Sequence, residues 1–118
     1  MNHRKLVLPE HMNDQGSLFG GYLLKWLDEF AYITASMEFP DHRFVTIALN
    51  NVEFRHPIRC GQILRFTISR ARLGGSSVEY LVEVFSEKSC GADEQVLFVT
   101  GITFVNVTET GEKQRIKP

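Results

Sequence analysis

The sequence predicts an α+β fold in which a strongly curved antiparallel β-sheet wraps around one long central helix. The segment from about Leu18 to Met37 is rich in helix-forming residues and apolar on nearly its whole circumference, which is typical of a buried helix. After Arg43, runs of alternating apolar and polar residues indicate four or five strands. Since 118 residues provide room for one core only, we expect residues 1–118 to form a single domain with the helix enclosed by the sheet.

The residues before the helix predict a short extended segment and a polar loop. "KLVL" is closed by Pro9, which is typical of a short extended segment. "HMNDQGS" then forms the polar loop that leads into the helix. The helix is expected to stop at "EFPDHR", because Pro40 lacks the N–H group that a continuing helix needs.

The first strand after the helix is expected in "FVTIALNNVEFRHPI". Its apolar face shifts by one residue at Asn50 and Asn51, so we expect a β-bulge there. The apolar face before the shift consists of Val45, Ile47 and Leu49, and Val52 and Phe54 continue it after the shift.

The remaining strands are expected in "QILRFTISRARL", "VEYLVEVFSE" and "VLFVTGITFVNVT", and "LGGSS" predicts a hairpin between the first two. The third is apolar on both faces, which favours an interior strand. Residues 109–118 are polar and are expected to form a flexible tail. The inward positions are expected to be Leu64, Phe66, Ile68, Val78, Tyr80, Val82 and Val84, and a second apolar surface that favours self-association would comprise Leu81, Phe85, Leu97 and Val99.

Composition argues against several classes of function. The net charge is −1, which gives no general reason to bind nucleic acid or an anionic membrane, and no segment is long and apolar enough for membrane insertion. The N-terminal segment lacks the pattern of a secretory signal. Cys60 and Cys90 are too few for a disulfide framework or a zinc site, so we expect inert thiols and a reducing, cytoplasmic location. No metal-binding or serine-hydrolase motif is present.

Asp28 is the residue in the helix that most needs an explanation. It lies too far inside the helix to act as an N-cap or to interact with the helix dipole. Two interpretations remain open. Asp28 belongs to a narrow solvated stripe with Lys25 and Glu29, or it is held in a cleft as a general base or nucleophile.

Gly20, Gly21 and Asn13 precede Asp28 and form a second group of candidates. Adjacent glycines are poor helix formers, so they mark either a flexible junction or a place where backbone N–H groups approach a ligand and stabilise an oxyanion. Asn13 is explained either as the residue of an Asx-turn or as a functional amide.

The hairpin residues Gly74, Ser76 and Ser77 form a third group, with Arg70 and Arg72 beside them. Small residues flanked by arginines suit a phosphate, although a Gly-Gly hairpin followed by serines needs no ligand to explain it. Phosphate-loop and dinucleotide-binding fingerprints are absent from the sequence.

"NDQGSLFGGYLLKWLDEFA", residues 13–31, closely resembles the signature of hotdog-fold acyl-CoA thioesterases of the acyl-CoA hydrolase family. In that family an Asn and a Gly precede a Gly-Gly helix start, and an Asp follows within the helix. "FVTIALNNVEFRHPIRCGQIL" and "GGSSVEYLVEV" resemble the family's next strand, turn and hairpin. The resemblance covers most of the chain, from about Leu6 to Val107.

The resemblance implies a hotdog fold and an enzyme that hydrolyses acyl-coenzyme A. By position, Asp28 would be the catalytic carboxylate, and Asn13, contributed by the partner chain, would orient water or substrate. Gly20 and Gly21 would direct N–H groups at the thioester oxygen. The hairpin group would contact coenzyme A: Gly74, Ser76, Ser77, Arg70 and Arg72. No metal or other cofactor is implied, and the chain would self-associate as a dimer or as a dimer-based tetramer or hexamer.

Two alternatives use the same fold without this chemistry. A non-catalytic acyl-CoA-binding or regulatory module would bind coenzyme A esters without releasing thiol. A dehydratase of this fold typically uses a histidine near the helix start, and the segment from Ser17 to Met37 contains none.

Overall fold

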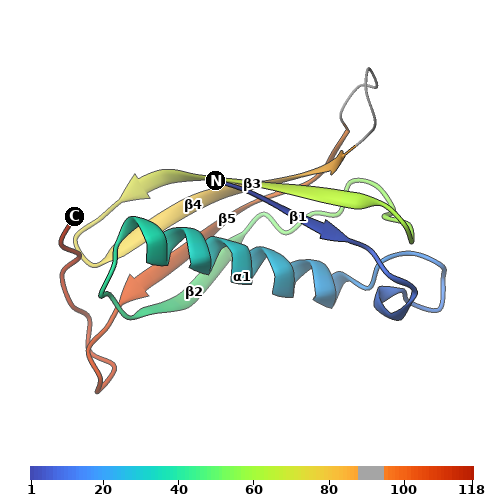
Figure 1. Cartoon of the computed structure of the whole chain (residues 1–118). Coiled ribbons are helices and arrows are strands. Elements are labelled where there is room, and N and C mark those ends of the chain that lie inside the picture. Colours follow the sequence, from blue (N-terminus) through green and yellow to red (C-terminus); the bar gives the residue numbers. More distant parts are fainter. Residues whose placement is uncertain (88–94) are drawn as a thin grey trace.

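One long helix packs against one five-stranded antiparallel sheet in the computed structural model, which describes residues 1–87 and 95–118 (Figure 1). The sheet order is β1-β3-β4-β5-β2, so β1 and β2 are its edges. The strand β5 is interior, as its apolar faces predicted. The elements are β1 (Asn2–Leu6), a 3₁₀ turn (Pro9–His11), α1 (Gly20–Glu38), β2 (Phe44–Asn50), β3 (Ile63–Leu73), β4 (Ser77–Glu87) and β5 (Val96–Asn106).

The helix α1 lies across the concave face of the sheet, as the sequence predicted (Figure 1). All the predicted inward positions of β3 and β4 are buried, because residues that alternate along a strand point to the same face. They pack against one side of α1, and the buried residues on that side are Leu23, Trp26, Leu27, Ala31, Thr34 and Ala35.

The opposite side of α1 remains open in the single chain. Tyr32 is 44% exposed and Met37 is 64% exposed, although an apolar circumference predicted a helix buried on every side. The sheet covers one side of the helix only, so the other apolar side is available to another molecule. Ile33 belongs to this exposed side as well.

The predicted bulge in the first main strand is misplaced. The register between β2 and β5 shifts between Thr46 and Ala48, and β2 then ends at Asn50. Because of this shift, Phe44 and Thr46 lie on the side that faces α1, whereas Val45 and Ile47, two of the three predicted inward residues, are exposed. The third, Leu49, follows the shift and packs against the core as predicted.

The C-terminal segment, expected to be a flexible tail, folds back onto the domain. Ile116 is 5% exposed, and its N–H group donates to the Gly75 carbonyl at 2.8 Å. The N–H group of Lys117 donates to Nε2 of His42 at 3.0 Å. The burial of Ile116 and the hydrogen bonds of the residues around it therefore hold this segment in place.

Two other expectations have definite outcomes. Leu97 is buried and does not belong to a second apolar surface, whereas Leu81 is partly exposed on the sheet. Cys60 is an exposed free thiol, and Cys90 lies outside the described residues.

Within the described residues, no helix is long and apolar enough to cross a membrane.

Candidate active site

Asp28 lies on α1 at the mouth of a cleft between the helix and β2. The Thr46 hydroxyl donates a hydrogen bond of 2.7 Å to Oδ1 of Asp28. The cleft has a volume of about 380 Å³, which lies within the range of ligand sites. Its lining residues are Lys25, Asp28, Glu29, Tyr32, Phe44 and Thr46.

The surroundings of Asp28 have features of both interpretations of this residue, the solvated stripe and the carboxylate held in a cleft. Lys25 and Glu29 are exposed on the same side, so this part of the helix is solvated. Asp28 itself is half-buried and its carboxylate is held from β2 by Thr46. Thr46 was missed by the sequence reasoning, because the apolar face of β2 was assigned to Val45 and Ile47.

Gly20 and Gly21 begin α1, where two aromatic rings approach the backbone closely. A Cβ atom on Gly20 would lie 2.9 Å from Cζ of Phe54, and one on Gly21 would lie 2.7 Å from Cε1 of Phe19. A side chain at either position would therefore displace one of these two exposed rings. Within the described residues, the N–H groups of Gly20 and Gly21 donate to no acceptor, so both stay available at the positive end of the helix dipole.

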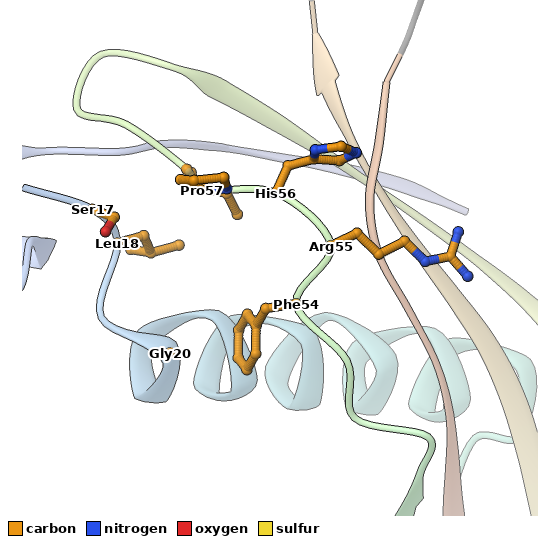
Figure 2. Close-up of a pocket in the computed structure, with 8 residues that line it drawn as sticks. Ser17, Leu18, Gly20, Phe54, Arg55, His56 and Pro57 are labelled. Atoms are coloured by element: carbon orange, nitrogen blue, oxygen red, sulfur yellow. The ribbon is translucent and has the colours of Figure 1, made fainter.

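A second cavity, of about 400 Å³, adjoins this helix start (Figure 2). It lies between the first turn of α1 and the segment that follows β2. Figure 2 shows the Phe54 ring directed toward the helix, whereas the Arg55 side chain points away from Gly20. The lining residues are Ser17, Leu18, Gly20, Phe54, Arg55, His56, Pro57 and Ile58.

Asn13 forms an Asx-turn in the loop before α1. Its Oδ1 accepts hydrogen bonds from the N–H groups of Gln15, at 2.8 Å, and Ser17, at 3.1 Å. Its side-chain nitrogen donates to no group in the part of the chain that the structure describes. In the single chain, no hydrogen bond joins the Asn13 and Asp28 side chains.

His11 holds this loop to the helix start. The ring is 6% exposed, and its centroid lies 4.8 Å from that of Tyr22 and 4.7 Å from that of Trp26. Nδ1 accepts a hydrogen bond of 3.0 Å from the N–H group of Leu8, and the His11 carbonyl accepts one of 2.9 Å from Phe19. Its proximity in sequence to Asn13 was the only signal that pointed to it.

The hairpin candidates lie at the other end of α1. Residues 74–77 turn beyond the C-terminal end of the helix, far along the chain's long axis from Gly20 (Figure 1). The Arg70 guanidinium lies 5.2 Å from the Phe39 ring, and its Nε lies 4.0 Å from Oε1 of Glu38. Within one chain, the structure does not bring the hairpin, Asp28 and the two glycines together.

Tyr80 connects this end of the helix to the sheet. Its side chain is fully buried, and its hydroxyl donates a hydrogen bond of 2.8 Å to Oε1 of Glu38. Burial raises the pKa of Tyr80 well above its usual value, and the Glu38 carboxylate raises it further. The phenol therefore stays protonated and acts as a fixed donor to the C-terminal end of α1.

Among the described residues, no group of three or more His, Cys, Asp and Glu side chains is arranged to hold a metal ion.

Comparisons with known proteins agree with this architecture. Residues 15–90 match the thioesterase superfamily. Acyl-coenzyme A thioesterase 11 of Mus musculus is 34% identical over 101 residues, which are 86% of this chain and 17% of that protein. The chain thus spans less than a fifth of the length of this relative.

Two solved structures are similar over 98% of this chain. An acyl-CoA hydrolase of Staphylococcus aureus, in complex with butyryl coenzyme A, coenzyme A and coenzyme A disulfide, has a TM-score of 0.88, with 28% identity over 70% of its chain. A hexameric hotdog-fold thioesterase of Campylobacter jejuni has a TM-score of 0.84, with 27% identity over 88% of its chain.

Variants of the staphylococcal hydrolase with an aspartate, an asparagine or a threonine replaced by alanine have also been crystallised. Its aspartate follows its asparagine at the same separation at which Asp28 follows Asn13. Its threonine follows the aspartate at nearly the separation between Asp28 and Thr46. On the evidence of its sequence match and its architecture, the chain belongs to the thioesterase superfamily and has the hotdog fold.

Proposed function

We propose that this protein hydrolyses acyl-coenzyme A thioesters to a free carboxylic acid and coenzyme A. The observation that carries the proposal is the Asp28 carboxylate, half-buried in a cleft and fixed by Thr46, in a chain of the thioesterase superfamily. The mouse and staphylococcal relatives described above are named for this reaction. No metal or redox cofactor takes part in the proposed mechanism.

Asp28 acts on the thioester carbonyl through its second carboxylate oxygen. Because Thr46 donates to Oδ1, Oδ2 is available to accept a proton from a water molecule that attacks the carbonyl carbon. The tetrahedral intermediate then collapses, the carbon–sulfur bond breaks, and the thiolate leaves as coenzyme A after protonation. Direct attack by Asp28 is the nucleophilic variant, in which water hydrolyses an acyl anhydride.

The oxyanion of that intermediate needs donors that a single chain does not place near Asp28. Asp28 lies about 12 Å beyond Gly20 along the axis of α1, given the rise per residue of a helix. The carbonyl group of one thioester cannot contact both the Gly20 N–H group and the Asp28 carboxylate of the same helix. We therefore assign Gly20, Gly21 and Asn13 to one copy of the chain and Asp28 to a second copy.

The exposed apolar surface beside Asp28 provides the contact between the copies. β2 is an edge strand whose outer side pairs with no other strand among the described residues, and Val45 and Ile47 on it are exposed. Tyr32 and Met37 extend this surface onto α1. A two-fold axis at the β2 edge makes the two helices antiparallel, which brings Asp28 of one copy toward Gly20 of the other.

Coenzyme A is proposed to follow the boundary between the copies. Antiparallel helices also bring the hairpin of one copy toward the helix start of the other, so residues 74–77, Arg70 and Arg72 would contact its phosphates and pantetheine. Whether dimers assemble further into tetramers or hexamers is decided by a sizing measurement. A cytoplasmic location stays a prediction.

The substitution Asp28→Asn tests the chemistry. It removes the base with little change in shape, so thiol release should fall by about 10²–10⁴-fold while the circular dichroism spectrum and the oligomeric state are retained. Glu10→Gln, an exposed acid outside the cleft, is the matched control. Turnover like that of the wild type in Asp28→Asn contradicts the mechanism.

Mixing two inactive variants tests the shared site. Asp28→Asn and Asn13→Ala each inactivate both sites of a homodimer, but their heterodimer contains one site with both residues intact. Random exchange should therefore restore about a quarter of the wild-type activity per chain. No recovery after confirmed subunit exchange would place both residues of each site in the same chain.

The wild-type protein itself separates this function from the non-catalytic alternative. Thiol release is measured with short, long and aryl acyl-CoA esters alongside binding of coenzyme A. Binding without thiol release from any ester would identify the regulatory module instead.

A further inference from the structure

The cavity beside Gly20 has no role in the chemistry derived above. It is separate from the Asp28 cleft, and its volume of about 400 Å³ suits a small ligand. From its walls and its position, we propose that this cavity holds the acyl chain of the substrate and that Phe54 limits the length of chain it accepts. This inference rests on the proposed function.

The cavity lining is mainly apolar, and its polar members are Ser17, Arg55 and His56. Ile58 is 4% exposed and Leu18 is 9% exposed, and Phe54 and Pro57 complete the apolar walls. The charged Arg55 side chain is directed away from the helix start (Figure 2). An alkyl chain gains free energy when it leaves water for such walls, whereas the amides of pantetheine would lose their hydrogen bonds to water there.

Two backbone contacts make the cavity a fixed feature. The N–H group of Leu18 donates to the Ile58 carbonyl at 2.7 Å, which joins the loop before α1 to the segment after β2. Phe54 forms an isolated β-bridge with Phe98, and their ring centroids are 5.1 Å apart. The Phe54 ring thus packs against Phe98 of β5, which limits its movement.

The position of Gly20 connects the cavity to the reaction. Gly20 is part of the cavity wall, and its N–H group donates to no acceptor among the described residues. A thioester oxygen bound at that N–H group leaves its acyl chain beside the cavity. A Cβ atom on Gly20 would lie 2.9 Å from Phe54. The Phe54 ring therefore lies beside Gly20, at the point where the acyl chain would enter the cavity.

The test measures kcat/KM for thiol release from straight-chain acyl-CoA esters of two to sixteen carbons. For the wild type, each added methylene should raise kcat/KM about fourfold until the cavity is full, after which the values level off. Phe54→Ala should move this break to longer chains, and Phe54→Trp should move it to shorter ones. Val52→Ala, on the same segment but outside the cavity lining, should keep the wild-type profile.

The shape of the profile decides the inference. If Phe54→Ala changes kcat/KM by the same factor for every chain length, or alters only inhibition by free coenzyme A, the cavity does not hold the acyl chain. Binding of the free fatty acids, measured by thermal shift, gives the same answer without catalysis: the chain length that gives the largest stabilisation should increase in Phe54→Ala. An unchanged optimum would overturn the inference, even where hydrolysis is confirmed. Absence of thiol release from every ester in the wild type refutes the proposed function instead.

Discussion

Replacement of His11 should weaken the loop that positions Asn13 and the start of α1. The ring is 6% exposed and contributes two separable interactions: Nδ1 accepts the N–H group of Leu8, and the ring packs against Tyr22 and Trp26. His11→Phe keeps an aromatic ring and removes the acceptor. His11→Asn keeps an acceptor and removes the ring, and His11→Ala removes both.

The size of each effect follows from the lost contact. An N–H group that loses its buried acceptor costs about 1–3 kcal/mol, and because Leu8 is half-buried we expect about 1–2 kcal/mol for His11→Phe. Each aromatic contact contributes about 0.5–1.5 kcal/mol, so His11→Asn should cost about 1–3 kcal/mol. His11→Ala should be the least stable of the three variants.

Urea unfolding at a fixed protein concentration measures these differences, since self-association adds to the apparent stability. For a chain of this length, 1 kcal/mol corresponds to about 3–6 °C in Tm. Thiol release at a temperature where all variants are folded should fall most in His11→Ala, because the loop and the helix start lose both supports. A Phe variant as stable as the wild type would refute the role of the Nδ1 acceptor.

Three further outcomes are expected. Thr46→Val should lower kcat about tenfold, since Asp28 loses a hydrogen bond to its charged carboxylate, whereas Thr46→Ser should stay near the wild-type value in the thiol-release assay. Tyr80→Phe should lose about 1–2 kcal/mol in urea unfolding, because the hydroxyl that binds Glu38 is removed; no change would show that the bond contributes nothing. Burial, with the N-terminal ammonium, lowers the pKa of His3, so the unfolded chain binds this proton more readily and stability falls as pH drops below 6.5. His3→Gln should make that fall smaller in thermal unfolding measured from pH 7.5 to 5.

Patterns local in sequence accounted for most of the fold. Leu64, Phe66 and Ile68 alternate along one strand, and all three are buried, because the side chains of a strand alternate between faces by geometry. The helix between the polar loop and Pro40 was equally predictable from its composition. Its bounds differ from the expected ones by one or two residues only.

Contacts between distant segments were not predictable in this way. The bulge at Ile47 leaves Val45 and Ile47 exposed while Leu49 still packs against the core, and its position depends on the register with β5. The Thr46–Asp28 bond depends on the same register, so it could not be read from either segment alone. The C-terminal segment folds back because Ile116 is buried beside the hairpin. The polar residues around Ile116 in the sequence give no sign of this contact.

The candidate site, with Asn13 contributed by a partner chain, stays a prediction drawn from the family resemblance. Asn13, Gly20 and Asp28 follow one another closely in sequence, but this closeness does not bring their functional groups together within one chain. A rigid helix instead fixes Asp28 about 12 Å from Gly20, and the Asx-turn holds Asn13 in the loop before it. The same helix exposes its apolar side beside the unpaired edge of β2. The separation within one chain and the open surface both agree with our proposal that a second copy covers this side of the helix and completes each site.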